Sequence, residues 1–367
     1  MKISKNQSLK LLLMLCTICS SVCYSDKADP TLNLNNSHKL IELASAHIVS
    51  RAIHIAALIK VADHLIDGPC NIYDLANKTH TNENALYRLL RLLASNGIFH
   101  ESENRFFSLT PLAELLVSSY PNSLQAWLAN HDGDEKRWRS YGHMQYSIET
   151  GKPAFNHIFG QGYFNLIAQD PKLAVSFDEG MRNLSEKEDQ AIANCYNFAP
   201  YKNIMDIGGG KGGLLTAIVK LNPFMQGIVY DLPHVEISAK AYLAQQNIEQ
   251  SITWQSGSFF EQIPLGHDLY ILKRILHDWD DELCIKILSN CRAAMNNTSK
   301  LIIIEAIVSS GNTRDFSKDV DLAMLVIFGG KERTKIEWES LLDAADLKLV
   351  NIQQTQSMLS ILEVVIK

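Results

Sequence analysis

From Tyr201 onward, short apolar runs alternate with stretches in which apolar residues recur at helical spacing. Five runs are expected to be buried strands: NIMDI at 203–207, QGIVYD at 226–231, ITWQSG at 252–257, HDLYILKR at 267–274 and LIIIEAIV at 301–308. Continuous apolar strands separated by helices are typical of a parallel sheet that is covered on both faces. The stretch at 348–367 predicts a closing strand pair. We therefore expect a doubly wound α/β domain over residues 201–367.

The pattern before Tyr201 is helical. Leucines at helical spacing predict a helix that ends near Gly97, and GIFHESENRFFSLT at 97–110 predicts two short strands around a polar turn. Helices followed by such a hairpin indicate a winged-helix-like domain over residues 37–110. Residues 111–200 are expected to be a helical linker that also lines the substrate site, interrupted at four prolines.

A winged helix raises the question of DNA binding, and its charge argues against that function. Residues 71–110 hold four basic and four acidic residues, which are Lys78, Arg88, Arg91, Arg105, Asp74, Glu83, Glu101 and Glu103. A DNA-binding domain normally has a basic face. The domain is therefore interpreted as a packing or dimerisation module in a homodimer, with no nucleic-acid partner.

The first 25 residues have a different composition. Three lysines precede the apolar run Leu11–Cys19, and small residues follow near Ser25. This order predicts a secretory signal peptide over residues 1–25, and the apolar run is too short for a stable membrane span. Export is the expected localisation, and an uncleaved apolar leader on a cytoplasmic enzyme is the alternative.

Composition excludes several classes of protein. The 367 residues are 46% hydrophobic and 20% charged with a net charge of −6, which is ordinary for a globular protein and does not favour a polyanion-binding surface. Four of the seven cysteines lie beyond the leader, at Cys70, Cys195, Cys284 and Cys291. They form no C-x-x-C pair and no dense framework, so no metal site is expected.

A glycine-rich loop follows the first expected strand. Gly208, Gly210 and Gly213 satisfy G-x-G-x-x-G, and Asp231 at the end of the next strand suits a ribose diol, so a nicotinamide cofactor is one interpretation. However, Asp206 lies two residues before the first glycine, where a carboxylate favours a cation and disfavours a pyrophosphate. A ligand with a ribose and a cationic tail is S-adenosylmethionine.

Five motifs then resemble one family. The chain is similar to class I S-adenosylmethionine-dependent O-methyltransferases of the plant caffeic-acid and bacterial small-molecule type. The motifs are MDIGGGKGG, YDLPHV, LKRILHDWDDE, LIIIEAIV and FGGKERTKIEWE, in the family's order. The resemblance covers residue 37 to the end of the sequence, and it implies a Rossmann-like domain that methylates a hydroxyl of a small aromatic or polyketide-like acceptor.

Three residues are expected to be catalytic. His277 follows an expected strand and opens the next helix, where a neutral imidazole can accept the proton of an acceptor hydroxyl. A lone histidine there is more often structural, but the resemblance also places Glu305 and Glu332 around it. Asp278 is a secondary candidate that is expected to cap or charge the start of its helix.

The resemblance also implies a set of cofactor-binding residues. They are Asp206, Gly208, Gly210, Asp231, Leu232, Ser258, Phe259, Lys273 and Ser185. Phe177 and Met181 resemble positions near the methyl donor, and Trp279 is expected either to stack on adenine or to fill the core. Ser258 departs from the family, which usually has an acid there. A hydroxyl makes a weaker hydrogen bond than a carboxylate, so weaker cofactor binding is expected.

Acceptor contacts are expected from the helices between residues 120 and 190 and from Asp321–Phe328, which are rich in apolar and aromatic residues. Two other functions remain open on the sequence. One is a nicotinamide-dependent oxidoreductase that uses the same glycine loop. The other is a winged-helix regulator with a non-catalytic ligand-binding domain.

Overall fold

The computed structural model describes residues 30–120, 123–169, 181 and 185–367. The expected signal peptide, Phe177 and most of the segment around it lie outside the described residues. The chain divides into two units, Met1–Ser50 and Arg51–Lys367. Helix α2, at Pro30–Leu58, begins in the first unit and ends in the second.

Helix α2 is long and rich in apolar residues. Its segment Leu34–Leu58 has the length and composition of a membrane span, a property that the core helices of soluble proteins share. Its last turns carry Ala52, Ala56 and Ala57, which are buried in the core of the second unit. In the first unit, the described part of α2 exposes several large apolar side chains, which are Leu34, Leu40, Ile41, Leu43 and Ile48.

The second unit begins with a small helical domain. After a 3-10 helix, its elements are β1 (Cys70–Asn71), α3 (Ile72–Lys78), α4 (Glu83–Ser95), β2 (Phe99–Ser102), β3 (Phe106–Leu109) and α5 (Pro111–Glu114). Helix α4 ends one residue before Asn96, and β2 pairs with β3 around a turn at Glu103–Arg105, as the pattern predicted. Strand β1, which was not predicted, adds a third strand beside β3.

Short helices connect this domain to the sheet. They are η3 (Trp127–Asp132, a π-helix), α6 (Glu135–Tyr141), α7 (Met144–Thr150), α8 (Ala154–Phe159) and α9 (Tyr163–Gln169), with a further helix over residues 185–195. Helix α6 packs against α8 and against α14 (Phe316–Ile327) of the next domain. Aromatic side chains of α8 and α9 form a separate small core with Val326 and Ile327 of α14.

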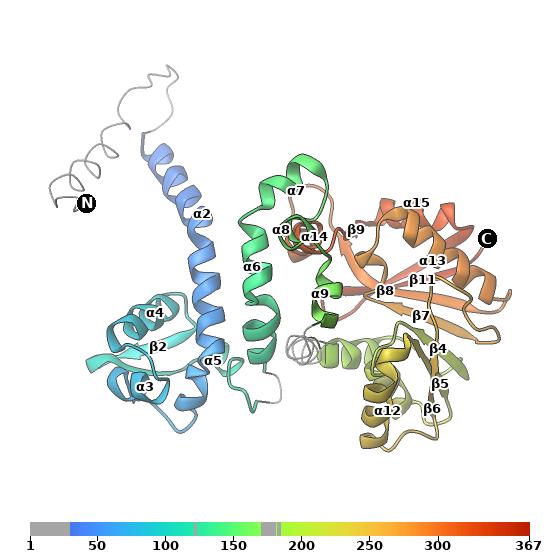
Figure 1. The fold of residues 1–367 in the computed structure, drawn as a ribbon, viewed down its shortest axis with the longest axis horizontal. Helices are drawn as coiled ribbons and strands as arrows, with labels where there is room; N and C mark the ends of the chain where they lie inside the picture. Colours follow the sequence, from blue (N-terminus) through green and yellow to red (C-terminus); the bar gives the residue numbers. More distant parts are fainter. Residues whose placement is uncertain (1–29, 121–122, 170–180, 182–184) are drawn as a thin grey trace. The chain divides into compact units, whose positions relative to one another are not determined.

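An eight-stranded mixed sheet forms the α/β domain (Figure 1). Its strands are β4 (Asn203–Ile207), β5 (Gln226–Asp231), β6 (Ile252–Ser256), β7 (Leu269–Lys273), β8 (Lys300–Val308), β9 (Arg333–Thr334), β10 (Leu347–Gln354) and β11 (Leu359–Ile366). The order is β10-β11-β8-β7-β4-β5-β6, with β9 paired to β8. Strands β4 to β8 are parallel, and the expected closing pair β10 and β11 is antiparallel.

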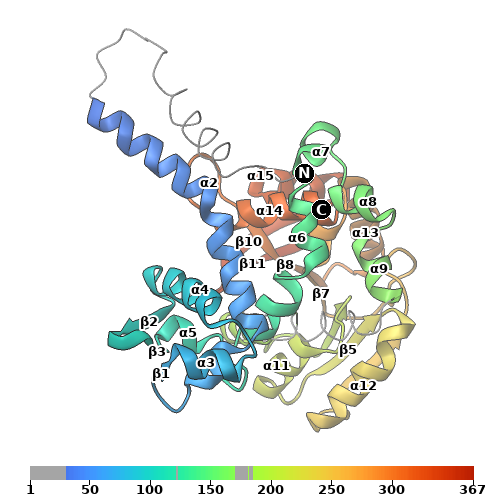
Figure 2. The same cartoon turned by 60° about the vertical axis from the view of Figure 1, so that its left-hand side comes forward.

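Both faces of the sheet are covered by helices (Figure 2). Alternate strand residues pack in opposite directions, for example Met205 toward α13 (Asp281–Ala294) and Ile204 toward α11 (Gly213–Leu221). Helix α15 (Lys335–Ala344) lies on the α13 face, and α12 (Glu236–Gln245) lies on the α11 face. This double covering explains why the strands are continuously apolar.

The strand order changes direction at β4. From β4 the sheet continues to β5 on one side and to β7 on the other. In such sheets ligands bind beyond the carboxyl ends of the strands at this switch point. The carboxyl ends of β4, β5 and β7, with the loops that follow them, carry most of the residues expected to be functional.

Candidate active site

The glycine loop follows β4 directly. Gly208 and Gly210 have φ of 71° and 57°, which is the left-handed region that glycine adopts most readily. The Gly208 amide donates to the carbonyl of Tyr230 on β5 at 2.8 Å. A Cβ on Gly209 would lie 2.6 Å from a carboxylate oxygen of Asp206, whereas a Cβ on Gly210 would meet nothing within 4 Å. The backbone at Gly210 is therefore open to a ligand.

Asp231 fixes this loop from the next strand. Its Oδ2 accepts from the Gly210 amide at 2.8 Å, and its Oδ1 accepts from the Leu232 amide at 2.6 Å. Leu232 is 43% exposed. The two residues expected at the ribose and the adenosine thus lie beside the glycine loop.

Asp206 is a buried carboxyl at the end of β4. Burial, together with the charges of Asp189 and Asp231 and against that of Lys273, raises its pKa to about 7. A cation placed beside this group would recover the ionised form. The open glycine backbone and the cluster of acids therefore fit a ligand with a positive charge and a ribose better than a pyrophosphate.

Lys273, expected near the adenine, is engaged in a buried ionic network. Its Nζ lies 2.6 Å from Asp189 and 3.6 Å from Glu188, and the Arg274 guanidinium also pairs with Glu188. The Asp189 carboxylate in turn lies where a Cβ on Gly213 would be. Whether Lys273 also contacts a cofactor stays a prediction.

The turn after β6 holds the other expected adenine contacts. The Ser258 hydroxyl accepts from the Phe260 amide at 3.2 Å, so this serine caps the turn. Phe259 lies against Phe260 and Trp279, with ring centroids 4.9 and 6.2 Å away. Trp279 thus packs in an aromatic cluster, as one of its two interpretations expected.

Ser185 and Met181 are both partly buried and helical, and their contacts with a donor stay predictions.

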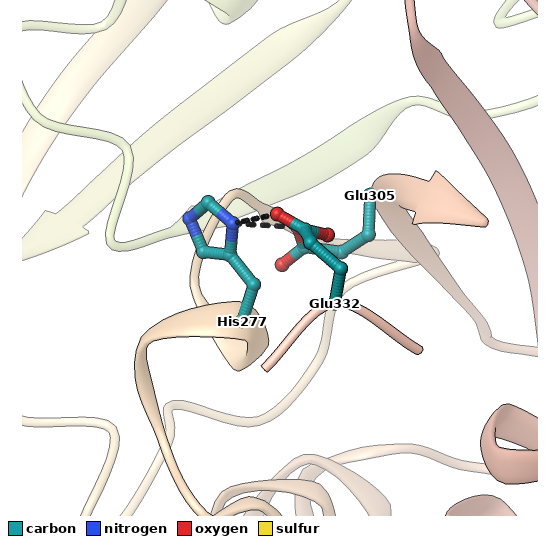
Figure 3. Close-up of side chains that lie close together, drawn as sticks. All are labelled: His277, Glu305 and Glu332. Carbon is teal, nitrogen blue, oxygen red and sulfur yellow. Dashed lines mark hydrogen bonds and ion pairs between the residues drawn. The ribbon is translucent and has the colours of Figure 1, made fainter. Parts of the chain in front are cut away.

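Three residues expected to be catalytic lie together (Figure 3). The Nδ1 of His277 lies 2.8 Å from Oε1 of Glu332 and 3.7 Å from Oε2 of Glu305. Because a carboxylate accepts hydrogen bonds, Nδ1 carries the proton and Nε2 is the atom available to an acceptor. Figure 3 shows the other ring nitrogen directed away from both glutamates.

Glu305 and Glu332 are themselves held by backbone groups. Oε1 of Glu305 accepts from the amides of Ile275 and Leu276 at 2.9 and 3.0 Å, which fixes the turn before His277. The Glu332 amide donates to Asp321 of α14 at 2.9 Å. Asp321, expected to line the acceptor, therefore positions Glu332.

Charges around His277 favour its protonated form. Burial alone would lower its pKa, but Glu305, Asp278 and Glu332 raise it to about 10. Burial also raises the pKa of Glu305. The charges of these three acids therefore favour the imidazolium form of His277.

The possible ligand atoms of His277, Glu305 and Glu332 lie within 4.8 Å of one another, which is close enough for all three to bind one metal ion.

The expected helix cap at Asp278 is wrong. Asp278 lies in a separate 3-10 turn, η5 (Leu276–Asp278), and α13 begins only at Asp281. The N-cap is Asp280, whose side chain accepts from the Leu283 amide. Because Asp278 and Asp280 are close neighbours in the chain, the sequence alone did not show which of them caps the helix. Asp278 instead lies with Oδ1 3.7 Å from Nε2 of His277.

Arg333, which was not among the residues expected to be functional, holds the His277 turn from both sides. Its guanidinium donates to the carbonyls of Leu276 and Trp279, at 3.0 Å each, and to Asp281 at 2.7 Å. The side chain is 1% exposed. An arginine directly after Glu332 was the available signal, but its partners are about 50 residues away in the chain.

Comparison with known proteins identifies the family. The profile of the O-methyltransferase domain matches residues 141–348, and that of the O-methyltransferase dimerisation domain matches residues 41–119. The chain belongs to the O-methyltransferase family. It is an S-adenosylmethionine-dependent enzyme, and the fold expected for the α/β domain is confirmed.

Individual relatives cover nearly the whole chain. Phenazine O-methyltransferase PhzM of Lysobacter antibioticus is 37% identical over 324 residues, which are 88% of this chain and 94% of the relative. CalO1, a methyltransferase of calicheamicin biosynthesis solved with bound S-adenosylhomocysteine, is 32% identical with a TM-score of 0.83, over 93% of this chain and 100% of that one. NcsB1 of neocarzinostatin biosynthesis was solved with S-adenosylmethionine and 2-hydroxy-5-methyl naphthoic acid. It is 30% identical with a TM-score of 0.75, over 87% of this chain and 96% of that one.

Proposed function

We propose that this enzyme methylates a hydroxyl group of a small aromatic or polyketide-like acceptor, with His277 as the general base. The observation that carries the proposal is the hydrogen bond of 2.8 Å between His277 Nδ1 and Glu332, which leaves Nε2 for the acceptor. The acceptor class is supported by relatives whose names or bound ligands are phenazines and naphthoic acids.

A base is needed because phenols are weak acids. With a pKa of about 10, roughly one phenol in a thousand is ionised at pH 7. A positioned base that removes the proton as the oxygen attacks contributes about 10²–10⁴-fold. In the proposed step the acceptor O–H bond breaks and its proton moves to Nε2 of His277. The oxygen would form a bond to the methyl carbon as the bond from that carbon to the sulfonium sulfur breaks, which would leave neutral S-adenosylhomocysteine.

The electrostatics of the site bear on this step. Bound S-adenosylmethionine supplies an electrophilic methyl group and a positive charge. Asp206 and Asp231 would hold its cationic and ribose ends beside the glycine loop. A positive charge near His277 offsets the field of Glu305, Glu332 and Asp278, so the pKa of the imidazole falls and its neutral form becomes accessible. Glu332 then stabilises the imidazolium that forms when the proton is accepted.

Calorimetric titration of the full chain with S-adenosylhomocysteine and, separately, with NAD tests the cofactor assignment. Micromolar binding of the first and none of the second is expected. Mass-spectrometric detection of an O-methylated phenol, made by wild type and lost in His277→Ala, then tests the base. Binding of NAD alone would overturn the proposal in favour of an oxidoreductase, and salt-sensitive DNA binding without product would favour a regulator.

Assembly and localisation belong to the same proposal. The dimerisation-domain match and the exposed apolar side chains of α2 support a homodimer, which light scattering of the purified protein tests. Export through residues 1–25 is tested by mass spectrometry of the mature N-terminus. An intact leader on the active enzyme would favour the cytoplasmic alternative.

A further inference from the structure

A buried guanidinium lies outside the His277 set. Arg137 on α6 is 6% exposed. Its NH1 lies 3.1 Å from Nε2 of His131 on the π-helix η3. Its Cζ lies 5.7 Å from the ring centre of Tyr163 and 5.5 Å from that of Phe328. The side chain is thus surrounded by aromatic rings.

No ion pair joins Arg137 to a carboxylate among the residues that the structure describes, and its Nε–H has no hydrogen-bond partner among them. The neighbouring acids are engaged elsewhere. Asp132 pairs with His54 at 2.8 Å, and Asp134 accepts from the Lys136 amide at 2.9 Å as the N-cap of α6. An anionic ligand in contact with this buried guanidinium would add the direct ion pair that the described acids do not form.

Two polar groups that contact Arg137, His131 and Tyr163, are neutral. Burial lowers the pKa of His131, and Arg137 and Arg274 lower it further, so this imidazole is neutral. Burial raises the pKa of Tyr163 to about 12, so its phenol is neutral as well. Burial opposes the charge of Arg137, whereas Tyr141, Tyr163 and the carboxylate of Asp132 favour it and raise the pKa of the guanidinium. Among the described residues, however, no carboxylate forms an ion pair with it.

A short loop connects the aromatic rings around Arg137 to the candidate base. Phe328 lies four residues before Glu332 in the chain, and the Lys331 amide between them donates to the His277 carbonyl at 2.8 Å. A Cβ on Gly330 would lie 2.0 Å from that carbonyl, so this loop packs tightly on the His277 turn. One short loop therefore joins the ring beside Arg137 to the partner of His277.

The rings supply flat apolar walls. Phe328 is stacked on Phe164 with ring centroids 5.3 Å apart, and Tyr163 meets Phe328 edge to face at 5.2 Å. A π-helix such as η3 is rare and often marks a functional site. A planar guanidinium beside aromatic faces matches a carboxylate attached to an aromatic ring, because its fork can donate two parallel hydrogen bonds.

We propose that Arg137 binds a carboxylate substituent of the aromatic acceptor, so that the preferred substrates are hydroxylated arene carboxylates. The inference rests on the proposed function, because it assigns the acceptor to the same site. It makes Arg137 a determinant of specificity, distinct from the base.

Two matched compounds test the proposal by binding rather than by turnover. Calorimetry on the full chain saturated with S-adenosylhomocysteine compares 3-hydroxy-2-naphthoate with 2-naphthol, which lacks only the carboxylate. Wild type is expected to bind the naphthoate at least tenfold more tightly. Arg137→Met is expected to lose at least tenfold for the naphthoate and less than twofold for the naphthol, and Arg137→Lys is expected to retain part of the preference.

Arg139→Met is the matched control, because Arg139 lies on the same helix but is exposed. It is expected to keep the wild-type preference. Circular dichroism and S-adenosylhomocysteine affinity check that each variant is folded. The comparison of the two compounds on wild type tests the proposal even if Arg137→Met does not fold. Equal binding of the two compounds by wild type, or a preference that survives Arg137→Met, would overturn the proposal. Failure of the proposed function would show separately, as carboxylate-selective binding without any methylated product.

Discussion

The Nδ1 of His277 and Oε1 of Glu332 lie 2.8 Å apart although 55 residues separate them in the chain. This pair orients Nε2 away from Glu305 and Glu332, and Asp278 lies 3.7 Å from it. If His277 is the base, His277→Ala lowers kcat by about 10²–10⁴-fold while affinity for S-adenosylhomocysteine stays within about twofold. Single-turnover methyl transfer measures the first quantity and calorimetry the second. His100→Ala is the control, because His100 is an exposed residue of strand β2. An equal loss in both variants would count against a role for His277.

Glu332 and Glu305 are expected to differ in their effects on His277. Glu332→Gln removes the charged acceptor of Nδ1–H, so the pKa of His277 falls and the base limb of the kcat/KM profile moves to lower pH. Glu305→Gln retains an oxygen for the Ile275 and Leu276 amides, so the turn is preserved while one charge is lost. Both pH profiles are expected to shift downward, with the larger drop in kcat for Glu332→Gln. An unchanged profile in both variants would mean that neither carboxylate is coupled to the titrating group.

Alkaline pH is expected to destabilise this site. The pKa of His277 is about 10 in the folded protein, above its ordinary 6.5. A raised pKa contributes stability that is fully present below pH 6.5 and is lost as the pH rises through about 10. Wild type is therefore expected to lose more Tm than His277→Gln between pH 7 and pH 10. Calorimetric melting at several pH values measures this, and parallel losses in the two proteins would contradict it.

Removing Lys273 is expected to destabilise the fold, because Asp189 and Glu188 would lose a partner in a buried setting. Breaking a buried ion pair on one side costs about 3–5 kcal/mol. Lys335→Met removes one partner of an exposed pair with Glu339 and is expected to change stability by less than about 0.5 kcal/mol. Urea unfolding compares the two variants. Equal midpoints would show that the buried network adds nothing to stability.

Ser258→Asp tests the departure from the family at the adenine end. A charge-assisted hydrogen bond is about twice as strong as a neutral one. Calorimetry is therefore expected to find S-adenosylhomocysteine bound several-fold more tightly by Ser258→Asp than by wild type. Ser258→Asn matches the shape without the charge and is expected to stay near wild type. Tightening in Ser258→Asn alone would assign the effect to shape.

The sequence predicted the strands of the α/β domain well because each is a continuous apolar run between loops. NIMDI, for example, coincides with β4. The meeting of His277, Glu305 and Glu332 was also expected, but only through a family resemblance, since spacing in the chain says nothing of contacts between distant loops.

Other features had no usable signal in the sequence. Arg333 and Arg137 look like ordinary surface arginines, and only tertiary packing buries them. The π-helix before α6 has no pattern distinct from an α-helix. Lys273 was expected at the cofactor, and its partners Glu188 and Asp189 could not be found because they lie in a helix more than 80 residues earlier.

Strand β11 pairs with β8, and Ser360 of β11 stands opposite Glu305 in the register. Until β11 has left the ribosome, β8 is an open edge, and the strand that carries Glu305 lacks half of its backbone partners. Domains fold as units during synthesis. Glu305 and Glu332 are therefore expected to be held in place around His277 only after the final strand of the sheet has been synthesised.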